Sequence, residues 1–217
     1  MNTFLNLTLG LHVLCGMVAL VVAPGAMLTQ KGGTWHRRWG RIYFCSMAIV
    51  ALTAVVLSLM RSGLFLLLVA IFSFYLALTG VRALRRKRPD TRADAWDWSA
   101  AGIAFAGSLG LIGYGVWRLM AGDGFGVVAL VLGGVGGVLS GSDLWRFRFP
   151  PKGPRTWFFL HMTRMLAAYI TTVSAFSAVN FMFLPPVVRW LWPGVIGTVG
   201  ITIWVRHYRK RFASQPA

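Results

Sequence analysis

Long apolar stretches separated by short basic segments repeat along the whole chain. Seven of these stretches approach the roughly 20 residues that a helix needs to cross the hydrocarbon core of a membrane. They cover residues 4–27, 42–60, 64–84, 98–119, 125–143, 157–182 and 186–206. The pattern therefore predicts an all-α integral membrane protein, a seven transmembrane helix bundle that forms a single domain over residues 1–217.

The composition supports a membrane protein and argues against a nucleic-acid-binding one. Of the 217 residues 57% are hydrophobic and only 12% are charged, whereas soluble domains carry about 25% charged residues. The net charge of +17 would suggest nucleic acid in a soluble protein. Here the basic residues flank apolar runs, so we interpret them as topology signals and as contacts to anionic lipids.

The basic residues also predict the orientation of the chain. Of the 22 Lys and Arg residues, 18 follow the first, third, fifth and seventh runs, and only Arg61, Arg118 and Arg189 lie on the opposite side. This asymmetry predicts an outer N-terminus and a cytoplasmic C-terminus. A six-span arrangement would place one basic cluster on the wrong side. The sequence leaves open a partner subunit or a homo-oligomer.

Small residues predict how two of the helices pack. Stripes of small residues let helix backbones approach closely in lipid, where no hydrophobic force drives association. Such residues recur at every fourth position in two neighbouring runs, at Gly102, Ala106 and Gly110, and at Gly133, Gly137 and Gly141.

The run 157–182 contains two residues that are unusual in a membrane span, His161 and Arg164. A helical wheel places them on one face with Ala168, and we expect this face to turn toward the bundle because arginine facing lipid is costly. Arg164 is also close enough to the cytoplasmic end to reach the interface instead. Among the five carboxylates, Asp143 lies at the matching depth, and an Asp143–Arg164 contact is the best single pairing.

Three further groups could carry chemistry. His12 lies near the middle of the first run, where it either bonds to a neighbouring helix or serves a ligand or proton relay. With His161, Arg164 and Asp143 it forms the candidate ligand pocket. The segment KGGTWHRRWGR at 31–41 is expected to form a Gly- and Arg-rich turn suited to a phosphate or lipid headgroup, and its candidate residues are Lys31, His36, Arg37 and Arg38.

Haem and zinc are the two cofactors that the histidines suggest. A bis-histidine haem site needs imidazoles at matching depth on different helices; His12 and His161 match poorly, and His36 and His161 match better but lie near the surface. A zinc site would use His36, Asp143 and His161 with water as the fourth ligand. No HxxxH or HExxH pair supports it.

Four segments together resemble an uncharacterised bacterial membrane family, domain of unknown function 2306. They are LHVLCGMVALVVAPGAML (11–28), KGGTWHRRWGRIY (31–43), FSFYLALTGVRALRRKRP (72–89) and HMTRMLAAYITTVSAFSAVNF (161–181). The resemblance implies seven or eight spans in the inner membrane and brings no activity. The positions that match its pattern are His12, Gly16, Pro24, Lys31, Gly32, His36, Arg37, Gly40, His161, Arg164, Met165 and Asn180.

Two functional classes follow from these residues. The first is a membrane redox or small-ligand protein, in which His12, His161 and Arg164 line a pocket for a quinone, haem or lipid-like molecule. The second is a zinc-dependent membrane hydrolase. A transporter is a third class, although no paired broken helices suggest the midplane site typical of transporters.

Overall fold

The structure of the protein is a computed structural model that describes residues 3–61, 63–88, 91–151, 153 and 155–214. Over these residues the chain is entirely helical, with seven α-helices and one 3₁₀ segment that continues α3. The elements are α1 (Thr3–Leu28), α2 (Thr34–Met60), α3 (Leu64–Arg82), η1 (Ala83–Lys87), α4 (Ala95–Met120), α5 (Gly126–Arg148), α6 (Thr156–Asn180) and α7 (Pro186–Ala213).

Each helix overlaps one of the seven predicted runs, but α2 begins eight residues before its run at 42–60. At the other end, α5 and α7 extend five and seven residues beyond their runs at 125–143 and 186–206. The chain reverses just before Thr34, where Gly32 adopts a φ of 77° that other residues rarely accept and Gly33 precedes the first helical residue. The expected turn at 31–41 is therefore wrong for most of its length. His36, Arg37 and Arg38 lie in the first two turns of α2.

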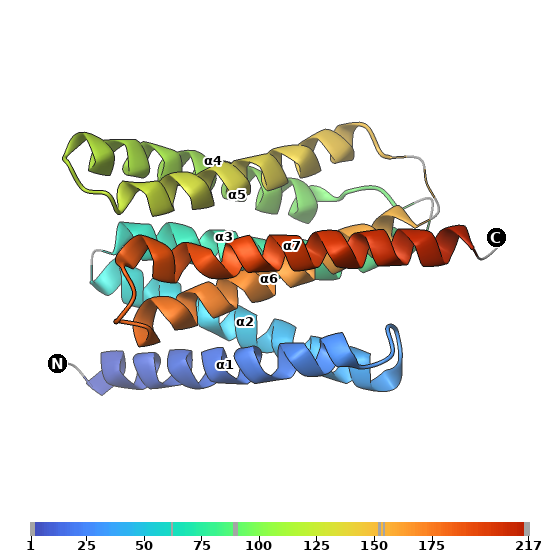
Figure 1. Ribbon diagram of the computed structural model, residues 1–217, viewed down its shortest axis with the longest axis horizontal. Helices are drawn as coiled ribbons and strands as arrows, with labels where there is room; N and C mark the ends of the chain where they lie inside the picture. Colours follow the sequence, from blue (N-terminus) through green and yellow to red (C-terminus); the bar gives the residue numbers. More distant parts are fainter. Residues whose placement is uncertain (1–2, 62, 89–90, 152, 154, 215–217) are drawn as a thin grey trace.

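The helices form three layers that run roughly parallel to one long axis (Figure 1). The hairpin of α4 and α5 forms one outer layer, and the hairpin of α1 and α2 forms the other. The central layer contains α3, α6 and α7, with α6 packed against α3, α7 and α1. The two termini lie at opposite ends of the bundle (Figure 1).

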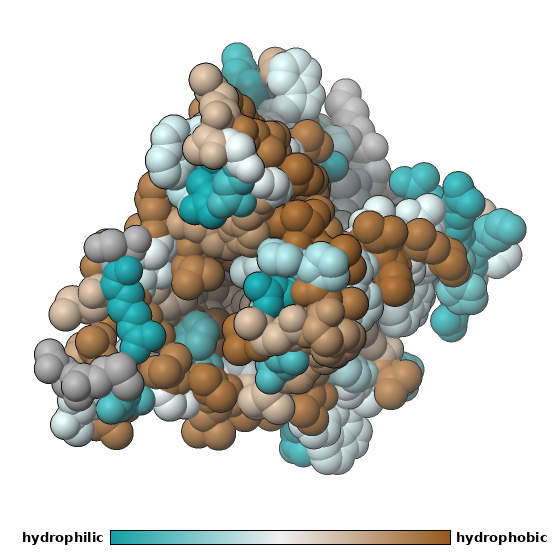
Figure 2. All heavy atoms as spheres, turned by 60° about the vertical axis from the view of Figure 1, so that its left-hand side comes forward, coloured by the Kyte–Doolittle hydropathy of each residue, from teal (hydrophilic) through white to brown (hydrophobic). Residues whose placement is uncertain are grey.

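The outer surface carries many large apolar side chains, such as Leu7, Val138 and Ile203, each more than half exposed. Figure 2 shows hydrophobic side chains over much of the visible surface, interrupted by separate hydrophilic groups. Such extensive apolar exposure is not sustainable in water and fits a lipid environment. Six described helices are long and apolar enough to cross a membrane, and α6 falls outside this set.

The α4–α5 hairpin packs through small residues, as predicted, although the stripes differ. Those buried between the helices recur at alternating intervals of three and four positions, the spacing of left-handed helix pairs. A Cβ atom at Gly133 would lie 2.8 Å from the Ser108 carbonyl oxygen. The prediction was correct for α5, where Cβ atoms at Gly137 and Gly141 would also contact α4 side chains. It was wrong for α4, where Gly102, Ala106 and Gly110 are exposed. The buried positions with this spacing, all small except Leu111, are Ala101, Ala104, Ser108, Leu111 and Gly115 on α4, and Gly126, Ala129, Gly133, Gly136 and Ser140 on α5.

Two of the remaining carboxylates hold the α3–α4 connection together. Asp94 caps α4 in a reciprocal capping box with Asp97, and both carboxylates pair with Arg82 at the end of α3. The hydrogen bond from Arg82 lowers the pKa of the Asp94 carboxyl. Basic residues close in sequence thus pair with both carboxylates, whereas Asp90 lies outside the described residues.

Candidate functional site

The predicted contact between Asp143 and Arg164 is confirmed. Arg164, on α6, places Nη2 2.8 Å from Oδ1 of Asp143, on α5. The two residues are 2% and 1% exposed, so Arg164 does not reach the membrane interface. The polar face of α6 points inward at this level, as the helical wheel predicted, because the guanidinium finds its counter-charge there.

Asp143 is the centre of a larger buried network. The Tyr75 hydroxyl on α3 donates to its Oδ2 at 2.7 Å, and Arg146 Nη1 lies 3.3 Å from Oδ1. Arg164 Nη2 also donates to the Leu139 carbonyl at 2.8 Å. The network joins α3, α5 and α6. One carboxylate is shared by two guanidinium groups, which leaves one excess positive charge, and Arg146 is the partly exposed member of the two.

Gly80 lets α6 approach α3 beside this network. A Cβ atom at Gly80 would lie 2.7 Å from the Met165 sulfur and 3.3 Å from the Arg164 Cβ. The close approach brings the Gly80 carbonyl oxygen within 2.7 Å of the His161 Nδ1. The position of His161 thus depends on the absence of a side chain at Gly80.

His36 and His161 come together from opposite parts of the sequence. Their ring centres are 6.3 Å apart and the ring planes are inclined by 79°. His36 belongs to the first turn of α2, and its Nδ1 lies 2.9 Å from the Ala26 carbonyl oxygen near the end of α1. The sequence predicted only that His36 and His161 lie at a similar depth, not that their rings lie close together.

The two hydrogen bonds fix the tautomer of each neutral ring. A carbonyl oxygen can only accept a hydrogen bond, so Nδ1 must carry the proton in both His36 and His161. The Nε2 atom of each neutral ring then keeps its lone pair. A backbone carbonyl bonded to Nδ1–H is the arrangement that commonly orients imidazoles whose other nitrogen binds a metal.

His12 does not join this group. Its Nδ1 lies 2.9 Å from the Thr53 hydroxyl on α2, which itself donates to backbone carbonyls of its own helix. Along α1, His12 is 14 residues from Ala26, or about 21 Å at 1.5 Å per residue. Of the two alternatives for His12, the structure shows the bond to a neighbouring helix, and the predicted pocket of His12, His161 and Arg164 is not formed.

The three-ligand zinc site is also not assembled. No three His, Cys, Asp or Glu side chains in the described part of the chain lie close enough to hold a metal ion together. His36 and His161 are brought together, but Asp143 is held by Tyr75, Arg146 and Arg164. The guanidinium groups compete for the carboxylate that zinc would need.

The basic candidates near the α1–α2 turn divide into two kinds. Lys31 donates to the carbonyls of Ala26 and Met27 at the end of α1, and burial lowers the pKa of its ammonium group. Lys31 and His36 are thus used within the protein. Arg37 and Arg38 are exposed, and lipid headgroup binding by these two residues stays a prediction.

Tyr75 and Gly80 were not singled out from the sequence. A hydroxyl-bearing ring within the apolar run 64–84, at the depth of Asp143, was a signal that could have identified Tyr75. Gly80 gave no comparable signal, because only the packing of α6 against α3 shows that a side chain there would collide.

The family of the chain is decided by residues of the first five helices. A family model described as "Predicted membrane protein (DUF2306)" matches residues 9–139. The chain belongs to this family. Neither a curated protein nor a solved structure matches the chain.

Membership in DUF2306, with the apolar helices of the structure, establishes an integral membrane protein. The matched residues include His12, Lys31, His36 and Arg37 among the site candidates. The segment 161–181 lies beyond them, so the resemblance stated for His161, Arg164, Met165 and Asn180 is not covered by the match.

Proposed function

We propose that this DUF2306 protein is a seven-span bacterial inner-membrane redox protein that carries a transition-metal centre on His36 and His161. Its N-terminus lies outside and its C-terminus lies in the cytoplasm. The observation that carries the metal centre is the pairing of two imidazoles, each with Nδ1–H on a backbone carbonyl.

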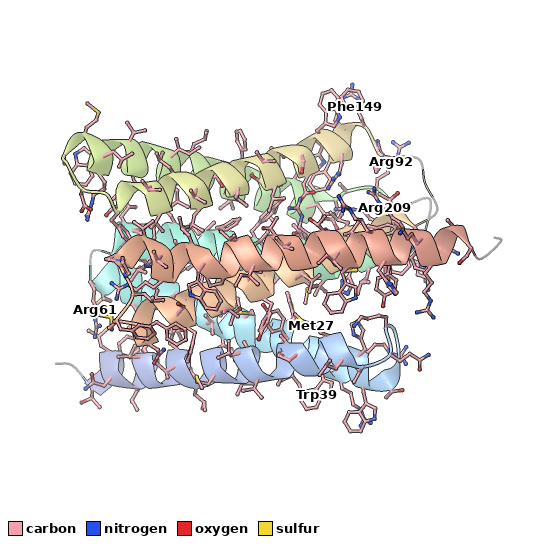
Figure 3. All side chains as sticks on the ribbon, in the orientation of Figure 1. Met27, Trp39, Arg61, Arg92, Phe149 and Arg209 are labelled. Carbon is pink, nitrogen blue, oxygen red and sulfur yellow. The ribbon has the colours of Figure 1, made fainter. Side chains whose placement is uncertain are left out.

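The arrangement of basic residues supports the seven-span topology. Arg92 and Arg209 lie at one end of the bundle and Arg61 lies at the other (Figure 3), and most of the other basic residues belong to the first end. With 25 residues, α6 is about 37 Å long and long enough to span the hydrocarbon core. Its lower hydropathy reflects its polar residues, several of which face protein rather than lipid.

The separation of the rings supports one metal shared by both residues. Two imidazole nitrogens on opposite sides of a metal, each about 2 Å from it, put the ring centres roughly 6 Å apart. The observed separation is 6.3 Å. Imidazole suits iron and copper, which change oxidation state. His36 and His161 would hold haem iron or a single copper ion through Nε2, and either metal would supply one-electron redox chemistry.

Titrating the purified protein with haem and, separately, with Cu(I) shows which of the two metals it binds. In the haem experiment, wild type should show the Soret and visible bands of six-coordinate haem at one equivalent. In the copper experiment, it should retain one equivalent of Cu(I) against a competing chelator. In the experiment that gives binding, His36→Ala and His161→Ala should each weaken affinity by about 100-fold, because each removes one of two ligands.

His207→Ala is the matched control, since His207 is exposed and is not one of the two proposed metal-ligating residues. It should bind like wild type. Thermal unfolding of each variant checks that His161→Ala, which also loses the bond to Gly80, remains folded. If neither haem nor Cu(I) binds wild type at one equivalent, or if His36→Ala binds as wild type does, the proposed metal centre is wrong.

A further inference from the structure

A crevice of about 700 Å³ opens between the end of α5, the beginning of α6 and the end of α7. Three arginines line it. Arg146 belongs to α5, Arg155 immediately precedes α6, and Arg209 belongs to α7. It lies at the end of the bundle where Phe149 closes α5 and Arg209 projects from α7 (Figure 3). In the proposed topology this is the cytoplasmic end.

We propose that this crevice binds one anionic phospholipid of the cytoplasmic leaflet, with its phosphate between the arginines and an acyl chain along the apolar wall. This site is separate from the proposed metal centre. It also differs from the headgroup site predicted near Lys31 and Arg37.

The charge of the crevice favours an anion. None of the residues that line it, as the structure describes them, is a carboxylate. The nearest carboxylate partner, Asp143, is buried and shared with Arg164, so it neutralises only part of the charge of Arg146. Arginine binds phosphate strongly because its planar group can donate two parallel hydrogen bonds.

Aromatic contacts hold two of the arginines in place. The Arg155 guanidinium lies 4.2 Å from the Phe212 ring centre and donates to the Phe212 carbonyl at 3.1 Å. The Arg209 guanidinium lies 5.7 Å from the Phe159 ring centre. Neither guanidinium pairs with a carboxylate within the described chain, so both retain donors for a ligand.

The apolar wall favours a lipid over a free inorganic anion. Phe159, Leu160 and Val205 line the crevice together with the arginines, and they come from the first turns of α6 and the adjoining part of α7. A phosphate alone would leave this wall unused, whereas an acyl chain would cover it. The combination of basic mouth and apolar wall matches a molecule with an anionic head and a hydrocarbon tail.

A second groove on the protein lacks this combination. It has a volume of about 370 Å³ and is lined by Gly200, Ile203, Trp204 and His207. Without an arginine or lysine in its lining, it offers no comparable site for a phosphate. Its lining of arginines distinguishes the crevice between α5, α6 and α7 from this groove.

The test measures lipid binding to delipidated, full-length protein by native mass spectrometry in detergent. Phosphatidylglycerol and phosphatidylcholine with identical acyl chains are titrated separately. Wild type should bind one phosphatidylglycerol at least 10-fold more tightly than phosphatidylcholine. Arg155→Gln/Arg209→Gln should lower the phosphatidylglycerol affinity about 10-fold, and Arg209→Gln alone should cause a smaller loss.

Two further variants separate a built site from general electrostatics. Arg88→Gln/Arg92→Gln removes the same charge at two exposed arginines that do not line the crevice, and should change the affinity less than twofold. Val205→Trp leaves every arginine in place but fills the apolar wall, and should weaken phosphatidylglycerol binding about 10-fold. Equal losses from both arginine pairs, no loss from Val205→Trp, or equal binding of inorganic phosphate would overturn the proposal.

Discussion

Replacing Asp143 by alanine is expected to lower the free energy of unfolding by about 3–5 kcal/mol, because it leaves the buried guanidinium of Arg164 without its counter-charge. Arg164 is 2% exposed, and an unpaired charge is especially costly in the interior of a membrane protein. Its remaining partners are the Leu139 carbonyl and the Ser142 hydroxyl, which do not neutralise it. Unfolding by SDS in mixed micelles, followed by tryptophan fluorescence, measures the loss.

A double-mutant cycle isolates the ion pair from the rest of the network. The variant Asp143→Ala/Arg164→Ala should be more stable than the sum of the two single losses indicates, with a coupling of about 1–3 kcal/mol. Arg85→Ala is the control, since its pair with Asp94 is exposed and should contribute at most about 1 kcal/mol. Additive losses would show that Asp143 and Arg164 do not stabilise one another.

A methyl group at Gly133 is expected to destabilise the protein by about 1–3 kcal/mol, the usual effect of overfilling a packed interface. The added Cβ would lie 2.8 Å from the Ser108 carbonyl oxygen and 2.9 Å from the Ile112 backbone nitrogen. These atoms belong to the backbone of α4, so the collision can be relieved only by moving the helices apart. The same SDS unfolding measurement applies to Gly133→Ala.

The neighbouring Gly134 provides a matched control for this substitution. A Cβ atom there meets nothing within 4 Å, so Gly134→Ala should leave stability unchanged within about 0.5 kcal/mol. Both variants make the same chemical change one residue apart on α5. Similar stability for the two would mean that close packing of α4 and α5 does not contribute to folding.

The number and position of the helices were predictable because lipid imposes a length and an apolar composition on each element. The Asp143–Arg164 contact was predictable for a related reason. A membrane protein with only five carboxylates offers few partners for a buried arginine, and depth along the helices leaves one.

The orientation of the histidine rings was not predictable from the sequence. Depth alone placed His36 near His161, but it could not show that carbonyls of Ala26 and Gly80 orient both rings. Because Asp143 lies at a similar depth, the sequence also predicted it as a third metal ligand. Its capture by Tyr75, Arg146 and Arg164 depends on the rotation of α3 and α5, which an apolar run does not encode.

The sequence by itself determined that this protein is a helical membrane protein, and it identified the inward face of α6, because the cost of polar groups in lipid acts on each helix separately. Only the tertiary structure decided which polar groups meet. It left His12 with Thr53, paired His36 with His161, and opened a basic crevice beside Arg155 and Arg209. These outcomes depend on helix rotation and close backbone approach, such as that at Gly80, which are properties of pairs of helices rather than of any one segment.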